Sequence, residues 1–247
     1  MLKSLDAYKL KCIAIIAMVL NHIVIAWWEI IPLKLAFPFY AAGGLTFPIM
    51  GFFVVEGYKN TSNLKKYISR ILVAGLISLP FHYLTIGLAL APSLNIMFTI
   101  TLSLGVLVMY DKIQSRILFW LLYVFLIVPV SSIFEWSFIG VSMVLLFYII
   151  KDEKMRRTLP PVCAVLLGTL SSLIFLIPGI DMPEMHGITS DPDFKAVNLT
   201  FILGILLASI LLRNFNGERG KETKWLFYVF YPAHLIVLAA VAMALGL

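Results

Sequence analysis

The sequence predicts an all-α bundle of membrane-spanning helices, and three observations support this fold class. Hydrophobic residues make up 61% of the 247 positions and charged residues only 13%, whereas soluble domains usually carry about 25% charged residues. The charges gather in short clusters separated by apolar runs of roughly 17 to 25 residues, the length that crosses a bilayer. The runs are continuous and do not alternate with period two, which favours helices over a transmembrane barrel.

The apolar runs divide the chain into nine expected spans. Together they form one transmembrane domain that covers residues 1–247. The expected ranges are 10–29, 36–57, 67–88, 94–110, 116–131, 136–150, 159–178, 196–213 and 224–246. The segments 94–110 and 116–131 are short for a bilayer, so we expect tilted helices packed inside the bundle there.

Lysine and arginine are distributed unevenly among the loops of this nine-span arrangement. Seventeen of the 19 fall in alternate loops that include the N-terminus, and only Lys34 and Lys195 fall in the others. Short cytoplasmic loops hold the excess of positive charge in multi-span proteins. We therefore expect a cytoplasmic N-terminus and a C-terminus outside the cell membrane. This bias accounts for most of the net charge of +6, so no nucleic-acid partner is expected.

Three histidines interrupt apolar runs: His22, His82 and His234. Each follows a cytoplasmic lysine or arginine by ten to twelve residues, which places all three about 15–18 Å into the membrane. A neutral imidazole takes and returns a proton near neutral pH, as a general base must. The alternative is a histidine packed and hydrogen-bonded by a neighbouring helix. No second ligand stands at a helical spacing such as i+4, so we expect no metal site.

A basic stretch follows Glu56 at the cytoplasmic end of the second span. It brings four cations into twelve residues, with Tyr67 among them: Lys59, Lys65, Lys66 and Arg70. Cations beside a bend can hold the phosphates of a cofactor, and Tyr67 can stack on an adenine. The alternative is a plain orientation signal, with Glu56 exposed or paired to Lys59 or Lys66.

Three segments resemble the TraX family of multi-spanning bacterial membrane proteins, whose founding member is implicated in N-terminal acetylation of conjugative pilin. They read "LKCIAIIAMVLNHIVI", "LTFPIMGFFVVEGYKNTSNLKKYISRILVAGLISLP" and "KWLFYVFYPAHLIVL". The resemblance covers most of the chain in order and spacing, and "FYPAHL" is among its most specific parts. It implies a location in the bacterial inner membrane.

The first two spans are also similar to the large family of integral-membrane acyltransferases that modify cell-surface glycans. In that family ten residues separate a basic residue from a histidine, as they separate Lys11 from His22 here. The segment "FFVVEGY" and the basic run after it look like that family's second-span "FF…SGF" region and its arginines. Both resemblances imply acyl transfer from cytoplasmic acyl-CoA to an acceptor reached within or across the membrane.

This activity assigns a role to each candidate residue. His22 deprotonates an acceptor amine or hydroxyl, and His234 or Asn21 orients it or stabilises the oxyanion. The expected binding residues for acetyl-CoA, or another acyl-CoA, are Lys11, Lys59, Lys65, Lys66, Tyr67 and Arg70. Glu56 and His82 are further polar positions in the spans.

Two positions depart from the TraX pattern. Asn21 stands where an aspartate is common, and Gly44 stands where an arginine is common. If those positions form an ion pair elsewhere in the family, losing both avoids one unpaired charge in the bilayer. One alternative is therefore a family member that has lost catalysis. Another is a small proton-coupled transporter or assembly factor, in which the mid-membrane histidines serve as a proton relay or a substrate site. The acceptor stays open among an exported peptide, a pilin-like protein, a glycan and a lipid.

Overall fold

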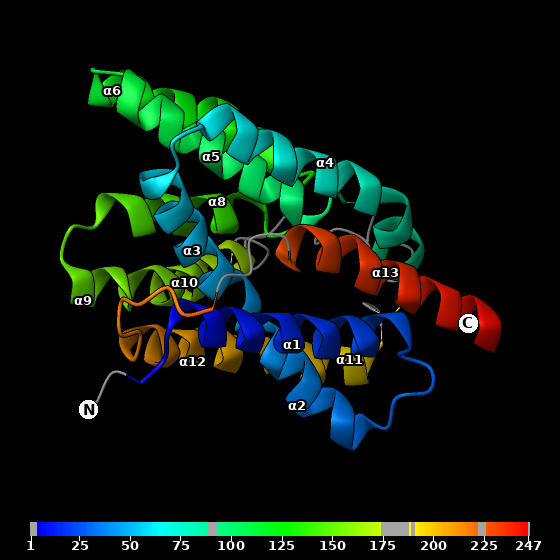
Figure 1. Cartoon of the computed structure of the whole chain (residues 1–247). Helices are drawn as coiled ribbons and strands as arrows, with labels where there is room; N and C mark the ends of the chain where they lie inside the picture. Colours follow the sequence, from blue (N-terminus) through cyan, green and yellow to red (C-terminus); the bar gives the residue numbers. More distant parts are fainter. Residues whose placement is uncertain (1–3, 88–92, 174–187, 189–190, 222–225, 247) are drawn as a thin grey trace.

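The computed structural model describes residues 4–87, 93–173, 188, 191–221 and 226–246, which fold as a bundle of helices (Figure 1). Within these residues no β-strand forms, and only two isolated bridges occur. The helices are α1 (Ala7–Ala26), α2 (Leu33–Gly43), α3 (Thr46–Asn60), α4 (Leu64–His82), α5 (Ile96–Lys112), α6 (Arg116–Leu122), α7 (Val128–Ser131), α8 (Ser137–Ile149), α9 (Glu153–Arg156), α10 (Leu159–Leu173), α11 (Pro192–Leu199), α12 (Phe201–Arg213) and α13 (Leu226–Leu245). Two π-helical turns, η1 (Tyr83–Gly87) and η2 (Tyr123–Ile127), extend α4 and join α6 to α7.

Five helical segments are long and apolar enough to cross a membrane. They are Ala7–Ala26, Leu33–Asn60, Leu64–Ile86, Pro192–Arg213 and Phe227–Leu245. The all-helical fold class is confirmed, and each of the nine expected ranges coincides at least in part with described helix. The count of nine crossings, the single domain and the cytoplasmic N-terminus stay predictions.

The expected span 36–57 is divided into α2 and α3 at two consecutive glycines. A Cβ atom on Gly44 would collide with the carbonyl oxygen of Phe201 in α12, and one on Gly204 would collide with that of Ala41. The backbones of α2 and α12 therefore touch at a point where only glycine fits. The chain turns at this contact before α3 begins.

Helices α1, α4 and α13 form the part of the bundle that matters most for the site. Helix α13 packs against α4 and also against α1, and Figure 1 shows it between them. The start of α1 is fixed by Asp6, which accepts a hydrogen bond from the Lys9 N–H, and the start of α4 by Asn63 in the same way. The backbone of Leu5 bonds to Asn214 and Asn216, so the loop after α12 is tied to the start of α1.

Candidate functional site

A hydrogen-bonded histidine pair joins α1 to α13. His22 Nδ1 and His234 Nε2 lie 2.9 Å apart. The two rings are stacked, with centroids 5.1 Å apart and planes inclined by 17°. Both side chains are buried. Two histidines that are 212 positions apart in the sequence thus form one polar unit in an apolar interior.

The hydrogen bonds of this pair determine which nitrogen is free to take a proton. His234 Nδ1 lies 3.1 Å from the carbonyl oxygen of Phe230, and a carbonyl can only accept, so Nδ1 carries the hydrogen. In a neutral His234, Nε2 then accepts, and the donor is His22 Nδ1. The remaining nitrogen of a neutral His22, Nε2, keeps its lone pair and is the basic atom of the pair.

His82 lies at the last position of α4 and is fully buried. Neither of its ring nitrogens has a hydrogen-bond partner in the described part of the chain. The three histidines come from α1, α4 and α13, and α13 packs against both of the other helices. They do not form a metal-ligand cluster, since no group of three His, Cys, Asp or Glu side chains occurs among the residues described.

Asn21 contacts a different glycine from the one that the sequence pattern indicated. A Cβ atom on Gly43 would lie 2.5 Å from Asn21 Cβ, so these two positions face each other across α1 and α2. Gly44 instead faces the backbone of α12. In this fold, a side chain at position 44 therefore meets α12 before it can reach position 21. The Asn21 amide nitrogen is buried and has no described hydrogen-bond partner.

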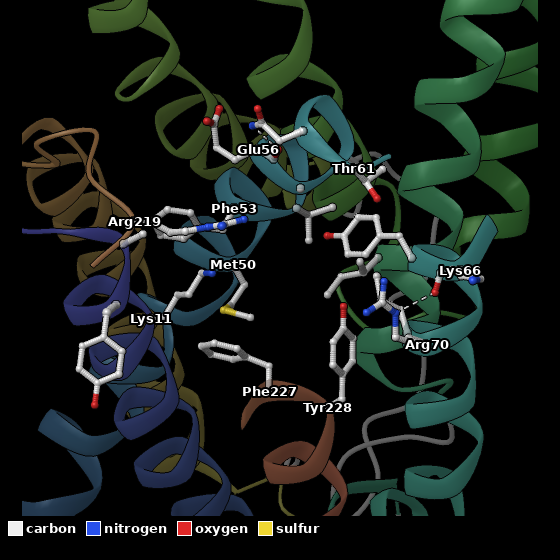
Figure 2. A pocket seen from close by; sticks show the side chains of 18 of the residues that line it. Lys11, Met50, Phe53, Glu56, Thr61, Lys66, Arg70, Arg219, Phe227 and Tyr228 are labelled. Atoms are coloured by element: carbon white, nitrogen blue, oxygen red, sulfur yellow. Dashed lines mark hydrogen bonds between the residues drawn. The ribbon is translucent and has the colours of Figure 1, made fainter. Parts of the chain in front are cut away.

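A large cavity opens between α1, α3, α4, α5, α13 and the loop after α12. Its volume is about 1440 Å³, which exceeds the 300–1,000 Å³ typical of small-molecule sites. Five cationic side chains line it, and Figure 2 shows Lys11 of α1 and Arg70 of α4 reaching toward its open centre. The five are Lys11, Lys66, Arg70, Arg219 and Lys221.

Aromatic rings surround two of these cations. Lys11 Nζ lies 5.0 Å from the ring centroid of Phe53 and 5.3 Å from that of Phe227. The guanidinium carbon of Arg70 lies 5.8 Å from the ring of Tyr228. Neither cation pairs with a carboxylate within the described ranges. The cavity thus offers positive charge and flat aromatic faces together, which suits an anionic ligand with a ring system.

The predicted binding residues divide into two groups. Lys11, Lys66, Tyr67 and Arg70 line the cavity, whereas Lys59 and Lys65 do not. Lys66 and Arg70 are one turn apart on α4 and share a face, while Lys65 is rotated by about 100° from Lys66. Lys59 lies over the ring of Tyr148, 5.6 Å from its centroid. Sequence reasoning missed the cavity positions of Arg219, Lys221 and Tyr228, because the pattern marked the two cations only as cytoplasmic charges.

Glu56 forms an ion pair with a residue that the sequence did not indicate. Its Oε1 lies 2.7 Å from Arg156 Nη1, so the expected alternative partners, Lys59 and Lys66, are wrong. Arg156 also pairs with Glu153 at 2.9 Å, and its guanidinium lies over the ring of Phe52. Glu56 therefore fastens α3 to α9, and its charge is neutralised at the cavity rim.

The cavity and the histidine pair lie along the same two helices, α1 and α13, although neither histidine lines the cavity. Lys11 and His22 are eleven residues apart, close to three full turns, so they share a face of α1 about 16 Å apart. On α13, Tyr228 lines the cavity and His234 follows six residues later. Along α1, the cavity residue Lys11 and the imidazole of His22 are thus about three helical turns apart.

Comparisons with known proteins show the family to which this chain belongs. The model of the family described as TraX protein matches residues 6–242. The chain belongs to the TraX family. It is 27% identical over 261 residues to the probable fimbrial assembly protein FimC, serogroup H1, of Dichelobacter nodosus, with 97% of each chain covered. No solved structure matches this TraX-family protein significantly.

Proposed function

We propose that this TraX-family protein is a membrane-embedded acyltransferase that moves an acyl group, most simply acetyl, from cytoplasmic acyl-CoA to an acceptor amine or hydroxyl. The observation that carries the proposal is the placement of a cationic cavity and a buried histidine pair along the same two helices, α1 and α13. A charged nucleotide in the cavity and an acyl group at the imidazoles are the two ends of one acyl-CoA molecule.

The cavity supplies what the nucleotide end of acyl-CoA needs. Lys11, Lys66 and Arg70 provide positive charge for phosphates, and Arg219 and Lys221 add to it from the loop after α12. Tyr67 and Tyr228 offer faces for the adenine. The extended pantetheine arm, on the order of 15–20 Å long, matches the helical rise of about 16 Å from Lys11 to His22.

The histidine pair supplies the base. As the acceptor nitrogen or oxygen attacks the thioester carbon, His22 Nε2 takes its proton. The C–S bond then breaks, and the CoA thiolate leaves and takes up the proton from His22. His234 Nε2 accepts the hydrogen of His22 Nδ1 throughout and holds the ring in place. Asn21, which is buried and immediately precedes His22 on α1, orients the acceptor.

The acceptor that we propose is the N-terminal segment of an exported pilin-type protein. The support is the similarity to a relative named as a probable fimbrial assembly protein, together with the resemblance to the founding TraX member. A glycan or lipid acceptor is the alternative that the integral-membrane acyltransferase likeness favours. The bilayer itself surrounds the apolar helices in either case.

The test is acetyl transfer by purified protein in vesicles. Radiolabelled acetyl-CoA is supplied on one side and a fimbrial-subunit N-terminal peptide on the other, with a glycan and a lipid fraction in parallel. The proposal expects label in one acceptor and a loss of labelling in the His22→Ala variant. Equal labelling by that variant would contradict the mechanism. No labelling of any acceptor, with proton flux in the same vesicles, would instead support the transporter alternative.

A further inference from the structure

The hydroxyl of Tyr231 is a buried polar group that the proposed mechanism does not yet use. Tyr231 is 2% exposed, and its Oη has no hydrogen-bond partner in the ranges described. The nearby backbone N–H of Ile96 donates instead to Glu135 Oε2, at 3.0 Å. The hydroxyl is therefore left with a hydrogen that no described acceptor receives.

Tyr231 lies between the cavity and the histidine pair. It follows Tyr228, which lines the cavity, by three residues and precedes His234 by three. The rings of Tyr231 and His234 contact each other with centroids 5.4 Å apart and planes inclined by 60°. Tyr231 does not itself line the cavity, and its hydroxyl lies near the backbone N–H of Ile96, which precedes the cavity residue Met97 on α5.

A buried hydroxyl without a hydrogen-bond partner lowers the stability of the folded protein, and the position of Tyr231 offers a reason for keeping it. Folding removes the group from water without providing a partner, which destabilises the resting protein. Phenylalanine has the same shape and lacks the cost. The protein is therefore less stable with tyrosine than with phenylalanine at position 231, unless a bound ligand brings an oxygen acceptor to the hydroxyl.

We propose that the Tyr231 hydroxyl donates a hydrogen bond to the carbonyl oxygen of the bound thioester, an inference that rests on the proposed function. During attack, the C=O electron pair moves to this oxygen, and Tyr231 stabilises the resulting oxyanion while keeping its own proton. When the tetrahedral intermediate collapses, the C=O bond reforms and the C–S bond breaks. Removal of one such donor lowers turnover by about 10²–10³-fold in enzymes that use it.

The experiment is isotope-edited infrared spectroscopy of [1-¹³C]acetyl-CoA bound to the purified full-length protein. It compares the parent, Tyr231→Phe and the control Tyr123→Phe. Tyr123 is a buried tyrosine in η2 that bonds to Ser142 Oγ at 2.7 Å and does not line the cavity. A hydrogen bond polarises the carbonyl, so the parent and the control should show a bound band at lower wavenumber than Tyr231→Phe. The reading needs no acceptor.

Each outcome decides the inference. A band shift that depends on Tyr231, with a thermal midpoint of Tyr231→Phe equal to or above that of the parent, supports it. Binding of acetyl-CoA with the same band in parent and Tyr231→Phe overturns the role of Tyr231 and leaves the proposed function standing. No binding of acetyl-CoA by the parent overturns the proposed function, and this inference with it.

Discussion

Two polar regions of the protein differ in whether their cationic side chains are paired with carboxylates. Around α9, the buried Arg156 and Arg157 pair with Glu56 and Glu153 at 2.7–3.2 Å, and Arg157 also donates to the carbonyl oxygen of Phe215. In the cavity, Lys11 and Arg70 meet aromatic rings and have no described carboxylate partner. In the sequence, the cations of both regions belong to the positively charged loops that we predict to be cytoplasmic.

The difference separates cations with a structural role from the cations that we propose to bind a ligand. A cation that is neutralised inside the protein holds helices together, and little of its charge remains to attract a ligand. A cation that lines a cavity without a carboxylate keeps its charge for an anion. We therefore expect substitutions around α9 to affect stability, and substitutions in the cavity or the histidine pair to affect acyl transfer. Three predictions test this contrast, from the largest effect to the smallest, and a fourth concerns a hydrogen-bonded carboxylate outside both regions.

The largest effect is expected from His22→Ala. Loss of the base should lower acetyl transfer by about 10²–10⁴-fold, while acetyl-CoA affinity stays nearly unchanged because the cavity cation Lys11 is about 16 Å away by helical rise. Single-turnover transfer from labelled acetyl-CoA measures this. The control is His82→Ala, a buried histidine outside the hydrogen-bonded pair, which should lose much less. Equal losses in both variants would remove His22 from its assigned role.

Arg156→Met should cause the largest loss of stability. It leaves the partly buried Glu56 without its partner, and breaking such a pair reduces the free energy of unfolding by about 3 kcal/mol. The thermal midpoint should fall, whereas the midpoint rise caused by acetyl-CoA should persist. Lys154→Met makes the same charge change at an exposed position of α9. A fall of the same size in that control would show that the pair is not the cause.

Lys11→Met should weaken acetyl-CoA binding by about tenfold, or about 1.4 kcal/mol. The ammonium lies in the cavity between Phe53 and Phe227, where the phosphates are proposed to bind. Equilibrium binding of labelled acetyl-CoA measures the change. Lys9→Met, two residues earlier on the same helix and exposed, is the matched control. An unchanged dissociation constant for Lys11→Met would exclude Lys11 from the binding site.

The smallest effect concerns a partly buried contact at the start of α11. Trp28 Nε1 donates to Asp191 Oδ2 at 2.9 Å, and this bond lowers the pKa of Asp191 below its usual 3.8. A lowered carboxyl pKa contributes stability above the usual value and loses it as pH falls. Trp28→Phe should therefore lower the thermal midpoint slightly at pH 7, with a smaller difference near pH 3.

Trp27→Phe is the control for this pH dependence, because Trp27 Nε1 has no hydrogen-bond partner in the described part of the chain. Its effect on the midpoint should not vary with pH between 7 and 3. A pH-independent loss in Trp28→Phe would mean that packing against Phe194, rather than the bond to Asp191, explains the stabilisation.

The sequence predicted the all-helical fold and several of the polar residues that the structure places in the cavity or in the histidine pair. Apolar runs and charge clusters act over one span, so they placed His22, His234 and the basic stretch correctly on helices. The break between α2 and α3 was missed, because it depends on Gly44 meeting the backbone of α12. The two sides of that contact, Gly44 and Phe201, are far apart in the sequence.

The sequence could not show which side chains form hydrogen bonds or ion pairs with one another. The bond between His22 and His234 spans 212 positions, and the pair of Glu56 and Arg156 spans 100. Which lysines face the cavity depends on the rotation of α4 against its neighbours, and this separates Lys66 from Lys65. The Tyr231 hydroxyl has no signature in the sequence at all, because its importance comes from a missing partner.

The most direct test of the acyl-CoA site is the thermal midpoint of the purified protein with and without acetyl-CoA. It compares the parent with two double variants of equal charge, Lys66→Ala with Arg70→Ala inside the cavity and Lys59→Ala with Lys65→Ala outside it. Ligand at a hundred times its Kd adds about 2.7 kcal/mol of stability. We predict a rise in the parent and in the outer double variant, and none in the cavity variant. No rise in the parent at millimolar acetyl-CoA, or the same rise in all three proteins, would contradict the site.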